Sequence, residues 1–139
     1  EITDPEMTRF NIRLSESVKH SLWSFQNSPG GDILVPKLKS FRVIDLINSY
    51  NPSFKLKKIG IRPGEKIHEE MITESDSLNT IELKNYYIIL PNAFSENKVL
   101  STRKYYKNKF KAKNVKRGFK YNSGNNFDFL TKNELKKFF

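Results

Sequence analysis

Short strand patterns alternate with amphipathic helical patterns along this chain, and that alternation constrains its fold more than any other feature. Apolar or alternating runs predict strands at residues 7–12, 32–36, 54–61 and 86–91. Helical spacing predicts helices between Ser15 and Pro29, over 41–50 and over 65–72. This order indicates the α/β class, but the strands are too few and short for a closed parallel sheet. We therefore expect a lobe that leans on a sheet supplied elsewhere.

The expected helices have recognisable faces and ends. In the first, Ser15 is the expected N-cap, and one face carries Leu14, Val18, Leu22 and Phe25. In the second, Ser40 is the expected cap, while residues 73–85 are polar and predict a loop. Near the chain end, Thr131 and Glu134 have capping-box spacing, with Leu130 and Leu135 placed as a hydrophobic staple. That short last helix is expected to dock through Leu135, Phe138 and Phe139.

Composition excludes several classes of protein. Aromatic residues make up 13% of the 139 residues, so wholesale disorder is not expected. The absence of Cys excludes disulfides, thiolate zinc sites and Cys nucleophiles, and the two histidines are too far apart in sequence to suggest a metal site. We find no apolar run of about 20 residues and no signal-peptide pattern, so we expect no membrane span. The first residues, EITDPEMTRF, suggest a processed chain or the later part of a longer protein.

The net charge of +10 is local. Residues 98–120 hold ten of the 25 Lys and Arg residues and no Asp or Glu, while the rest of the chain is balanced. Interleaved Tyr105, Tyr106 and Phe110 leave open a surface that binds nucleic acid or another polyanion. The simpler interpretation is a solvated, lysine-rich surface, because Lys is common throughout the chain. Nucleic acid is therefore not the expected partner.

The segment 59–70 is the most informative for chemistry. A strand is expected to end at Ile61, which places Arg62 at its C-terminal end, and Pro63-Gly64 then turns the chain. The planar guanidinium of Arg suits bidentate phosphate binding, and Glu65 could accept hydrogen bonds from a sugar diol. On spacing alone, a surface turn with a solvated ion pair fits equally well.

Six motifs in order carry a family resemblance. They are DPEMTRFNI (4–12), GGDILVPK (30–37), IGIRPGEKIHEEMI (59–72), DSLNTIE (76–82), YYIILP (86–91) and GFKYNSGNNFDFLTKNEL (118–135). Together they resemble the C-terminal part of the UDP-N-acetylglucosamine 4,6-dehydratases, which are extended short-chain dehydrogenase/reductase enzymes of bacterial surface polysaccharide and pseudaminic acid biosynthesis. Residues 92–117 match none of the motifs.

The resemblance implies a fold and a set of binding residues. It implies an α/β C-terminal substrate-binding lobe of a Rossmann-like, NAD(P)-binding enzyme, without the N-terminal dinucleotide-binding domain. In the family pattern Arg62 binds the diphosphate and Glu65 the ribose, while Arg9, with Thr8 beside it, faces the diphosphate or sugar. Lys66 is expected to add positive charge at the phosphates. His68 belongs to the same motif and is more simply a packing residue.

The redox machinery is not expected in this chain. The resemblance implies NADP or NAD, held by the N-terminal domain, but no glycine-rich dinucleotide turn occurs here, so this chain alone should bind no cofactor. The family's catalytic Tyr-x-x-x-Lys should precede the MTRF motif. Tyr105 and Lys109 have that spacing, but they lie in the basic run, where aromatic packing is the simpler explanation. We assign no catalytic residue and expect no dehydratase activity from the isolated chain.

As a whole, the resemblance implies an enzyme that oxidises UDP-N-acetylglucosamine at C4, eliminates water across C5 and C6, and returns the hydride. This chain would be its substrate-binding portion, organised as a nucleotide-sugar-binding lobe (1–97), the basic segment (98–120) and a connector with a capped helix (121–139). Expected partners are the UDP-sugar, a Rossmann domain in the same or a separate chain, and further copies in a cytoplasmic homo-oligomer. A non-catalytic basic binding module and an inactive gene fragment remain the alternatives.

Overall fold

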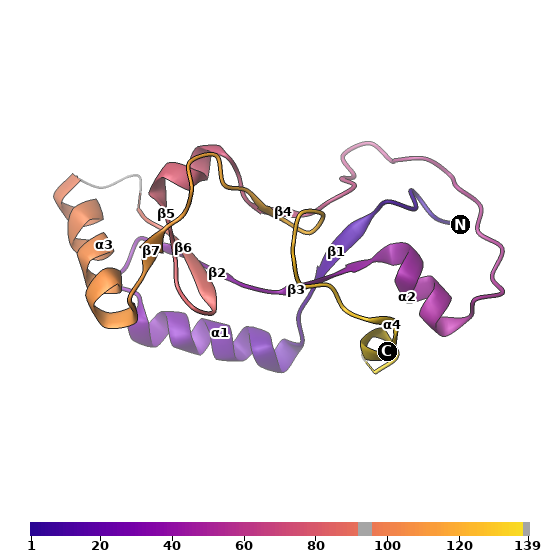
Figure 1. Cartoon of the computed structure of the whole chain (residues 1–139), viewed down its shortest axis with the longest axis horizontal. Helices are drawn as coiled ribbons and strands as arrows, with labels where there is room; N and C mark the ends of the chain where they lie inside the picture. The colour runs from indigo at the N-terminus through magenta and orange to yellow at the C-terminus, as the bar shows by residue number, and fades with distance from the viewer. Residues whose placement is uncertain (92–95, 138–139) are drawn as a thin grey trace. The chain divides into compact units, whose positions relative to one another are not determined.

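The computed structural model describes residues 1–91 and 96–137 and divides the chain into two compact units (Figure 1). The first unit combines Glu1–Ile12, Leu38–Glu70 and the described part of the chain from residue 121. The second combines Arg13–Lys37 and Met71–Lys120. Each unit therefore joins segments that are distant in sequence. No helix of the described residues is long and apolar enough to cross a lipid bilayer.

The first unit is built on one antiparallel strand pair. Strand β1 (Thr8–Asn11) pairs with β3 (Lys39–Arg42) in the register that places Thr8 opposite Arg42. Helix α2 (Val43–Tyr50) follows β3 directly and contacts the short helix α4 (Lys132–Leu135), which strand β8 (Tyr121–Asn122) precedes. Its core consists of Phe41, Leu130 and Leu135, with Val43 and Leu46 packed against them.

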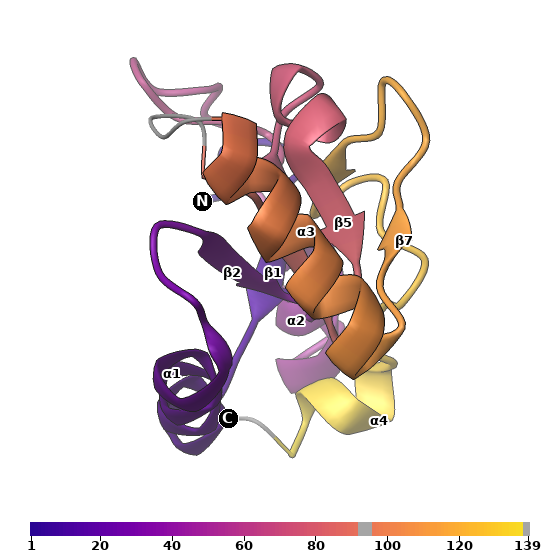
Figure 2. The ribbon, with the colours of Figure 1, turned by 90° about the vertical axis from the view of Figure 1, so that its left-hand side faces the viewer.

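The second unit contains a four-stranded antiparallel sheet. Its strand order is β2 (Ile33–Pro36), β6 (Tyr86–Ile89), β5 (Thr80–Glu82), β7 (Lys113–Asn114). Helix α1 (Leu14–Asn27), the 3-10 helix η1 (Ser75–Asn79) and helix α3 (Glu96–Phe110) complete the unit, and Figure 2 shows α3 running across β5. Tyr106 of α3 is fully buried on the sheet residues Ile81 and Ile88. Strand β4 (Glu70–Ile72) begins where the middle segment of the first unit ends.

Most of the strongly periodic segments are confirmed. The strands expected at 7–12, 32–36 and 86–91 are β1, β2 and β6, and the first two helices are α1 and α2. Both helices differ at their starts, because the N-caps are Arg13 and Arg42 rather than Ser15 and Ser40. Ser40 lies instead inside β3, where its backbone N–H donates to Asp128.

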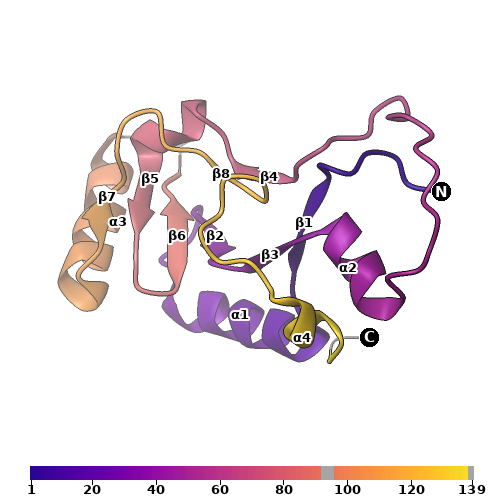
Figure 3. The same ribbon diagram turned by 45° about the vertical axis from the view of Figure 1, so that its right-hand side comes forward.

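The strand expected at 54–61 is wrong. Lys58 makes a single parallel bridge with Ile2, and the rest of the segment is irregular because Gly60 has φ +86°. Ile2 donates to the carbonyl of Lys57 and accepts from the N–H of Ile59, so two backbone hydrogen bonds hold the connection to the N-terminal residues (Figure 3). The apolar spacing of this segment thus reflects its contacts with the N-terminal residues rather than the pairing of a strand in a sheet.

The helix expected at 65–72 is also wrong, because residues 70–72 form β4 and the preceding residues are turns. The spacing of half-buried Ile67 and Met71 imitated a helical face. The loop expected at 73–85 contains η1 and β5. The Asp76 carboxylate accepts from the N–H and hydroxyl of Thr73, which lowers the pKa of Asp76. A polar sequence therefore forms a compact turn that a hydrophobic pattern does not detect.

The capped last helix is confirmed. Thr131 Oγ1 accepts from the Glu134 N–H at 3.3 Å, and the Glu134 carboxylate accepts from the Thr131 N–H at 2.8 Å. Leu130 and Leu135 are buried in the same cluster, as the staple predicts. Docking through Phe138 and Phe139 concerns positions outside the described residues.

The apolar face of α1 points to solvent. Leu14 is 82% exposed and Phe25 91%, and Val18 and Leu22 are 51% and 56% exposed. The opposite face carries the packing, because Trp23 stacks on Tyr86 and His20 Nδ1 lies 3.0 Å from the Tyr86 hydroxyl. The helix therefore contacts its own unit through aromatic and polar side chains.

Candidate binding site

Residues 62–65 form a rigid turn in the first unit. The Glu65 N–H donates to the Arg62 carbonyl at 3.0 Å, and Gly64 has φ +80° behind Pro63, which is the pattern of a type II turn. The Glu65 carboxylate closes the turn again by accepting from the Arg62 N–H at 3.2 Å and from the Thr3 hydroxyl at 3.3 Å. Gly64 is needed here, because a side chain at that φ is strained.

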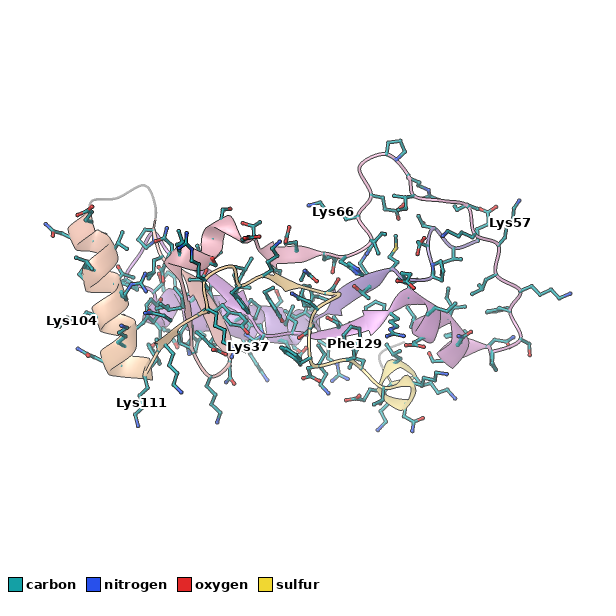
Figure 4. The ribbon with its side chains drawn as sticks, turned by 45° about the horizontal axis from the view of Figure 1, so that its top comes forward. Lys37, Lys57, Lys66, Lys104, Lys111 and Phe129 are labelled. Atoms are coloured by element: carbon teal, nitrogen blue, oxygen red, sulfur yellow. The ribbon has the colours of Figure 1, made fainter. Side chains whose placement is uncertain are left out.

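Two cations of this turn face solvent. Arg62 and Lys66 are exposed, and within the described ranges no residue pairs with the Arg62 guanidinium or the Lys66 ammonium. Figure 4 places Lys66 on the connection close to β4. Lys66 also lines a pocket of about 340 Å³ together with Ile67, His68, Glu70 and Asn122. Lys66 thus stands at a concave surface and Arg62 on the adjacent turn, and an anion in solvent can reach both charges.

The Arg9 guanidinium is held by contacts within the first unit, including one from Nη2 to Met7 Sδ at 3.0 Å. Its Nη1 donates to the carbonyls of Thr8 at 2.6 Å and Ile67 at 3.1 Å, and its Nε lies 4.0 Å from Glu69 Oε1. The side chain is 25% exposed. No hydrogen bond or ion pair among the described residues joins the Arg9 guanidinium to the 62–65 turn. Arg9 therefore ties β1 to residues 67–69 and leaves part of its fork accessible.

A buried hydroxyl network lies behind these residues. Thr8 is 4% exposed and Ser123 is fully buried, and their hydroxyl oxygens are 2.6 Å apart. Thr8 Oγ1 also lies 2.8 Å from His68 Nδ1. The Glu69 N–H donates to Ser123 Oγ at 2.9 Å, and the Ser123 N–H donates back to the Glu69 carbonyl. Segments around residues 8, 68 and 123 are thus fastened together.

Sequence reasoning assigned Thr8 to the ligand and overlooked Ser123. The buried Thr8 hydroxyl contacts His68 and Ser123, so Thr8 can affect the pocket only by positioning these neighbouring residues. The only available signal for Ser123 was its place in the YNSG motif. A small polar residue inside a turn-rich segment does not by itself reveal a buried partner.

Gly124 explains the position of His68. A Cβ at Gly124 would lie 2.6 Å from His68 Nδ1, so the imidazole occupies the space that any larger residue would need. The Nδ1 side of His68 packs against Gly124 and is hydrogen-bonded to Thr8, while the residue as a whole is exposed. His68 still borders the pocket with its other edge.

Comparison with known proteins establishes the family. A family model described as polysaccharide biosynthesis protein matches residues 1–91. The chain belongs to this family. It is 41% identical over 142 residues to a UDP-N-acetylglucosamine 4,6-dehydratase (inverting) of Campylobacter jejuni, a match that covers 96% of this chain and 40% of that protein. A UDP-glucose 4-epimerase of Rickettsia canadensis is 35% identical over 92 residues, covering 63% of this chain and 27% of the epimerase.

A solved structure agrees with this assignment. The X-ray structure of Pen from Bacillus thuringiensis aligns with a TM-score of 0.72 at 26% identity, covering 99% of this chain and 39% of that one. The resemblance to the C-terminal part of the dehydratases and the α/β class are therefore confirmed. The chain spans about 40% of the length of the dehydratase that it matches.

The described residues do not fit a dinucleotide cofactor. Gly30 and Gly31, with φ +95° and +83°, lie between the end of α1 and the start of β2. A dinucleotide phosphate needs the opposite order, a strand that turns into a helix whose N-terminus faces the phosphate. No chemical step is therefore assigned to a cofactor held by these residues.

The Tyr105 and Lys109 pair takes part in packing. Lys109 Nζ lies 2.9 Å from the Tyr105 hydroxyl, donates to Asn27 of α1 at 3.1 Å, and stands 5.2 Å from the Phe110 ring. Tyr105 also contacts the buried Tyr106 edge to face. These contacts support the aromatic-packing interpretation of this spacing.

Part of the basic segment (98–120) forms contacts with other residues of the second unit. Lys98, Arg103, Lys109 and Lys120 are bonded to Pro29, Asn114, Asn27 and Glu74 respectively. The described residues contain no cluster of His, Cys, Asp and Glu that could hold a metal ion. The segment thus contributes to the fold of the second unit.

Proposed function

We propose that this chain is the nucleotide-sugar-binding portion of a UDP-N-acetylglucosamine 4,6-dehydratase-type enzyme of bacterial surface polysaccharide biosynthesis. The observation that carries the proposal is the exposure of Arg62 and Lys66, which pair with no described residue, on and just after a turn held rigid by Glu65. The 41% identity to the Campylobacter jejuni dehydratase supports the choice of substrate. The chain would bind and orient the sugar, while oxidation at C4, loss of water across C5 and C6, and hydride return take place on other residues.

The proposed ligand contacts are supported by the chemistry and exposure of the side chains. The Arg62 fork would bind the diphosphate through two parallel hydrogen bonds, and Lys66 would add a point charge. The accessible part of the Arg9 fork would contribute a further contact. Glu65 already accepts from Arg62 and Thr3, but a carboxylate has about four acceptor positions, so it could also accept from a ribose hydroxyl.

Thr8 would act indirectly. Its hydroxyl is hydrogen-bonded to His68 Nδ1 and so fixes the orientation of the His68 ring at the edge of the pocket. Thr8→Ser keeps the hydroxyl and Thr8→Val removes it at similar volume. Ligand affinity should therefore survive the first substitution and fall in the second.

Calorimetric titration with UDP-N-acetylglucosamine tests the proposal. Arg62→Ala should weaken binding at least tenfold, about 1.4 kcal/mol, because a bidentate diphosphate contact is lost. Lys57→Ala is the matched control, since Lys57 is an exposed cation of the same connection. UDP should compete and uridine should not. No binding at millimolar ligand, or equal effects of the two substitutions, would refute the proposal.

The complete enzyme would need a second part. We propose that a Rossmann domain, in the same longer polypeptide or in a separate subunit, binds NADP or NAD and supplies the catalytic groups of a cytoplasmic homo-oligomer. The isolated chain incubated with NADP and UDP-N-acetylglucosamine should then give no 4-keto product. A dinucleotide-binding reading frame upstream of this one, or continuous with it, would agree with the proposal, and unrelated DNA there would oppose it.

A further inference from the structure

Positive charge gathers on the solvent side of α3 and on the segment that follows it. Six cations there are exposed and have no hydrogen-bond or ion-pair partner among the described residues, and we name them the basic face: Lys104, Lys107, Lys111, Lys113, Lys116 and Arg117. Residues 98–120 contain no Asp or Glu that could neutralise them. Figure 4 shows Lys104 and Lys111 projecting outward from α3 and its C-terminal end. No described contact of the fold uses these six charges.

The basic face is built around one exposed ridge of α3. Leu100, Lys104 and Lys107 follow each other at intervals of four and three residues, which places them within about 60° around the helix axis. The buried Thr102 and Tyr106 lie on the opposite side of the helix. Leu100 is 61% exposed, so an apolar side chain stands in line with the lysines. The ridge therefore combines positive charge with one leucine that no neighbour covers.

Lys111 continues the ridge at the end of α3. Its φ of +55° is the only positive φ of a non-glycine residue within the described ranges. The Lys111 N–H donates to the Lys107 carbonyl and the Ala112 N–H donates to the Tyr106 carbonyl, a helix end at which glycine is the usual residue. Glycine adopts this φ without strain, whereas lysine does not. The chain thus places a cation at the end of the ridge at some cost in backbone strain.

We propose that the basic face docks this chain on an anionic lipid surface. Clusters of about four to eight basic residues on a helix suit anionic headgroups, and each lysine near such a surface strengthens binding about fivefold. A straight helix can lie along a bilayer leaflet, so Lys104, Lys107 and Lys111 reach headgroups together. Leu100 enters the interfacial layer from the same ridge, where its exposed side chain loses contact with water. The contact is peripheral, because the other side of α3 stays packed on the sheet.

Nucleic acid fits the basic face less well. Single-stranded nucleic acid is held largely by bases that stack on exposed aromatic rings. The aromatic residues of this segment turn inward instead, because Tyr106 is fully buried, Tyr105 packs edge to face against it, and Phe110 packs against Trp23. The fork of Arg103 is bonded within the second unit. The basic face is left with mainly lysine, a compact point charge that suits a diffuse anionic surface better than a bidentate contact.

Sedimentation with lipid vesicles tests the docking. The chain should bind phosphatidylcholine vesicles that contain about 30% phosphatidylglycerol, dissociate from them as the salt concentration rises, and not bind vesicles of phosphatidylcholine alone. The ridge variant, which combines Lys104→Gln, Lys107→Gln and Lys111→Gln, should bind the anionic vesicles at least about thirtyfold more weakly. Glutamine keeps the helix propensity and most of the side-chain length, so the variant should fold as the unsubstituted chain does.

A control variant separates the ridge from net charge. Lys19→Gln, Lys55→Gln and Lys57→Gln together remove the same charge from exposed lysines of other segments, and they should weaken vesicle binding less than about threefold. Leu100→Ser should weaken vesicle binding by about three- to tenfold, because the leucine no longer enters the interfacial layer. The same substitution should leave any binding to duplex DNA unchanged, since nucleic acid offers no apolar layer.

Several outcomes would overturn the proposal. No binding to anionic vesicles at low salt, or equal binding to both kinds of vesicle, would mean that the charges do not dock on lipid. Equal losses in the ridge variant and the control variant would assign the effect to net charge. Tighter binding to mixed-sequence duplex DNA than to vesicles, abolished in the ridge variant, would assign the basic face to nucleic acid.

The docking and the proposed UDP-sugar site can be tested separately. Helix α3 belongs to the second unit, whereas Arg62 and Lys66 belong to the first. The ridge variant should therefore bind UDP-N-acetylglucosamine as the unsubstituted chain does, and Arg62→Ala should bind anionic vesicles normally. Failure of one proposal would thus be distinguished from failure of the other.

Discussion

Removal of the Ser123 hydroxyl should weaken the whole first unit. Ser123 Oγ accepts from the Glu69 N–H at 2.9 Å and lies 2.6 Å from Thr8 Oγ1, with Ser123 fully buried. Ser123→Ala is nearly isosteric, so it removes these interactions without creating a large cavity. It leaves the Glu69 N–H without its acceptor and removes one of the two partners of the buried Thr8 hydroxyl, which keeps its contact with His68 Nδ1.

The expected loss follows from those two groups. A buried polar group deprived of its partner costs about 1–3 kcal/mol. Glu69 is exposed enough for water to compensate part of its loss, and the buried Thr8 hydroxyl loses one contact but keeps His68. We therefore expect Ser123→Ala to lower the free energy of unfolding by about 1–2 kcal/mol. Thr8→Val should cost about 2 kcal/mol, and the double variant should cost about 1 kcal/mol less than the sum.

Urea unfolding followed by circular dichroism measures these losses, with hydrogen exchange at the Glu69 amide as the local reading. Fluorescence of Trp23, the single tryptophan, reports the second unit separately. Ser101→Ala is the matched control, because Ser101 is exposed on α3 and should change stability by less than about 0.5 kcal/mol. Strict additivity of Thr8→Val and Ser123→Ala, or a loss below 0.5 kcal/mol for Ser123→Ala, would show that the network does not hold the unit together.

Three further predictions concern single contacts. Gly124→Ala should destabilise the first unit by about 1–3 kcal/mol, since its Cβ would stand 2.6 Å from His68 Nδ1, and His68→Ala in the same chain should recover most of that loss in urea unfolding. Hydrogen bonds from Lys39 and from the backbone of Thr131 lower the pKa of Glu134 from 4.5 to about 2, so the stability that Glu134 contributes should be complete above pH 4.5 and decline toward pH 2. Glu134→Gln should flatten that slope in acid titrations monitored by circular dichroism, and an unchanged slope would contradict the assignment. Tyr106→Phe should cost about 1.5–3 kcal/mol, because the buried hydroxyl donates to the Asp32 carboxylate, while Tyr105→Phe beside it should cost under 0.5 kcal/mol.

Local patterns in the sequence predicted the elements whose own residues determine their conformation. The capping box of Thr131 and Glu134 and the strand at Tyr86–Ile89 both depend on contacts within a few residues, and both are present. Segment 54–61 was misread because its backbone partner, Ile2, lies more than 50 residues away. Likewise, a helix at 65–72 satisfied apolar spacing but ignored the turn that Gly64 imposes.

The same distinction between local and long-range contacts applies to the residues of the site. Arg62 and Glu65 could be proposed from sequence because a turn of four residues brings them together. Ser123 could not, since its hydroxyl reaches Thr8 across 115 positions. The apolar residues of α1 were visible as a helical face, but spacing alone does not say that this face is the exposed one. The face that packs inward depends on Trp23 and Tyr86, whose stacking is a tertiary contact.

In the proposed site, the residues that bind the ligand differ from the residues that stabilise the fold around it. This difference can be measured. Arg62 and Lys66 are exposed and unpaired, whereas Thr8 and Ser123 are buried and fully bonded. Loss of an exposed cation should reduce nucleotide affinity and leave stability unchanged, because no described contact of the fold depends on its charge. Loss of a buried hydroxyl should reduce stability first and affinity only through displacement of His68. A plot of affinity loss against stability loss, with the wild-type chain at the origin, should therefore place Arg62→Ala and Ser123→Ala near different axes. If both variants fell on one line through the origin, binding and folding would use the same residues.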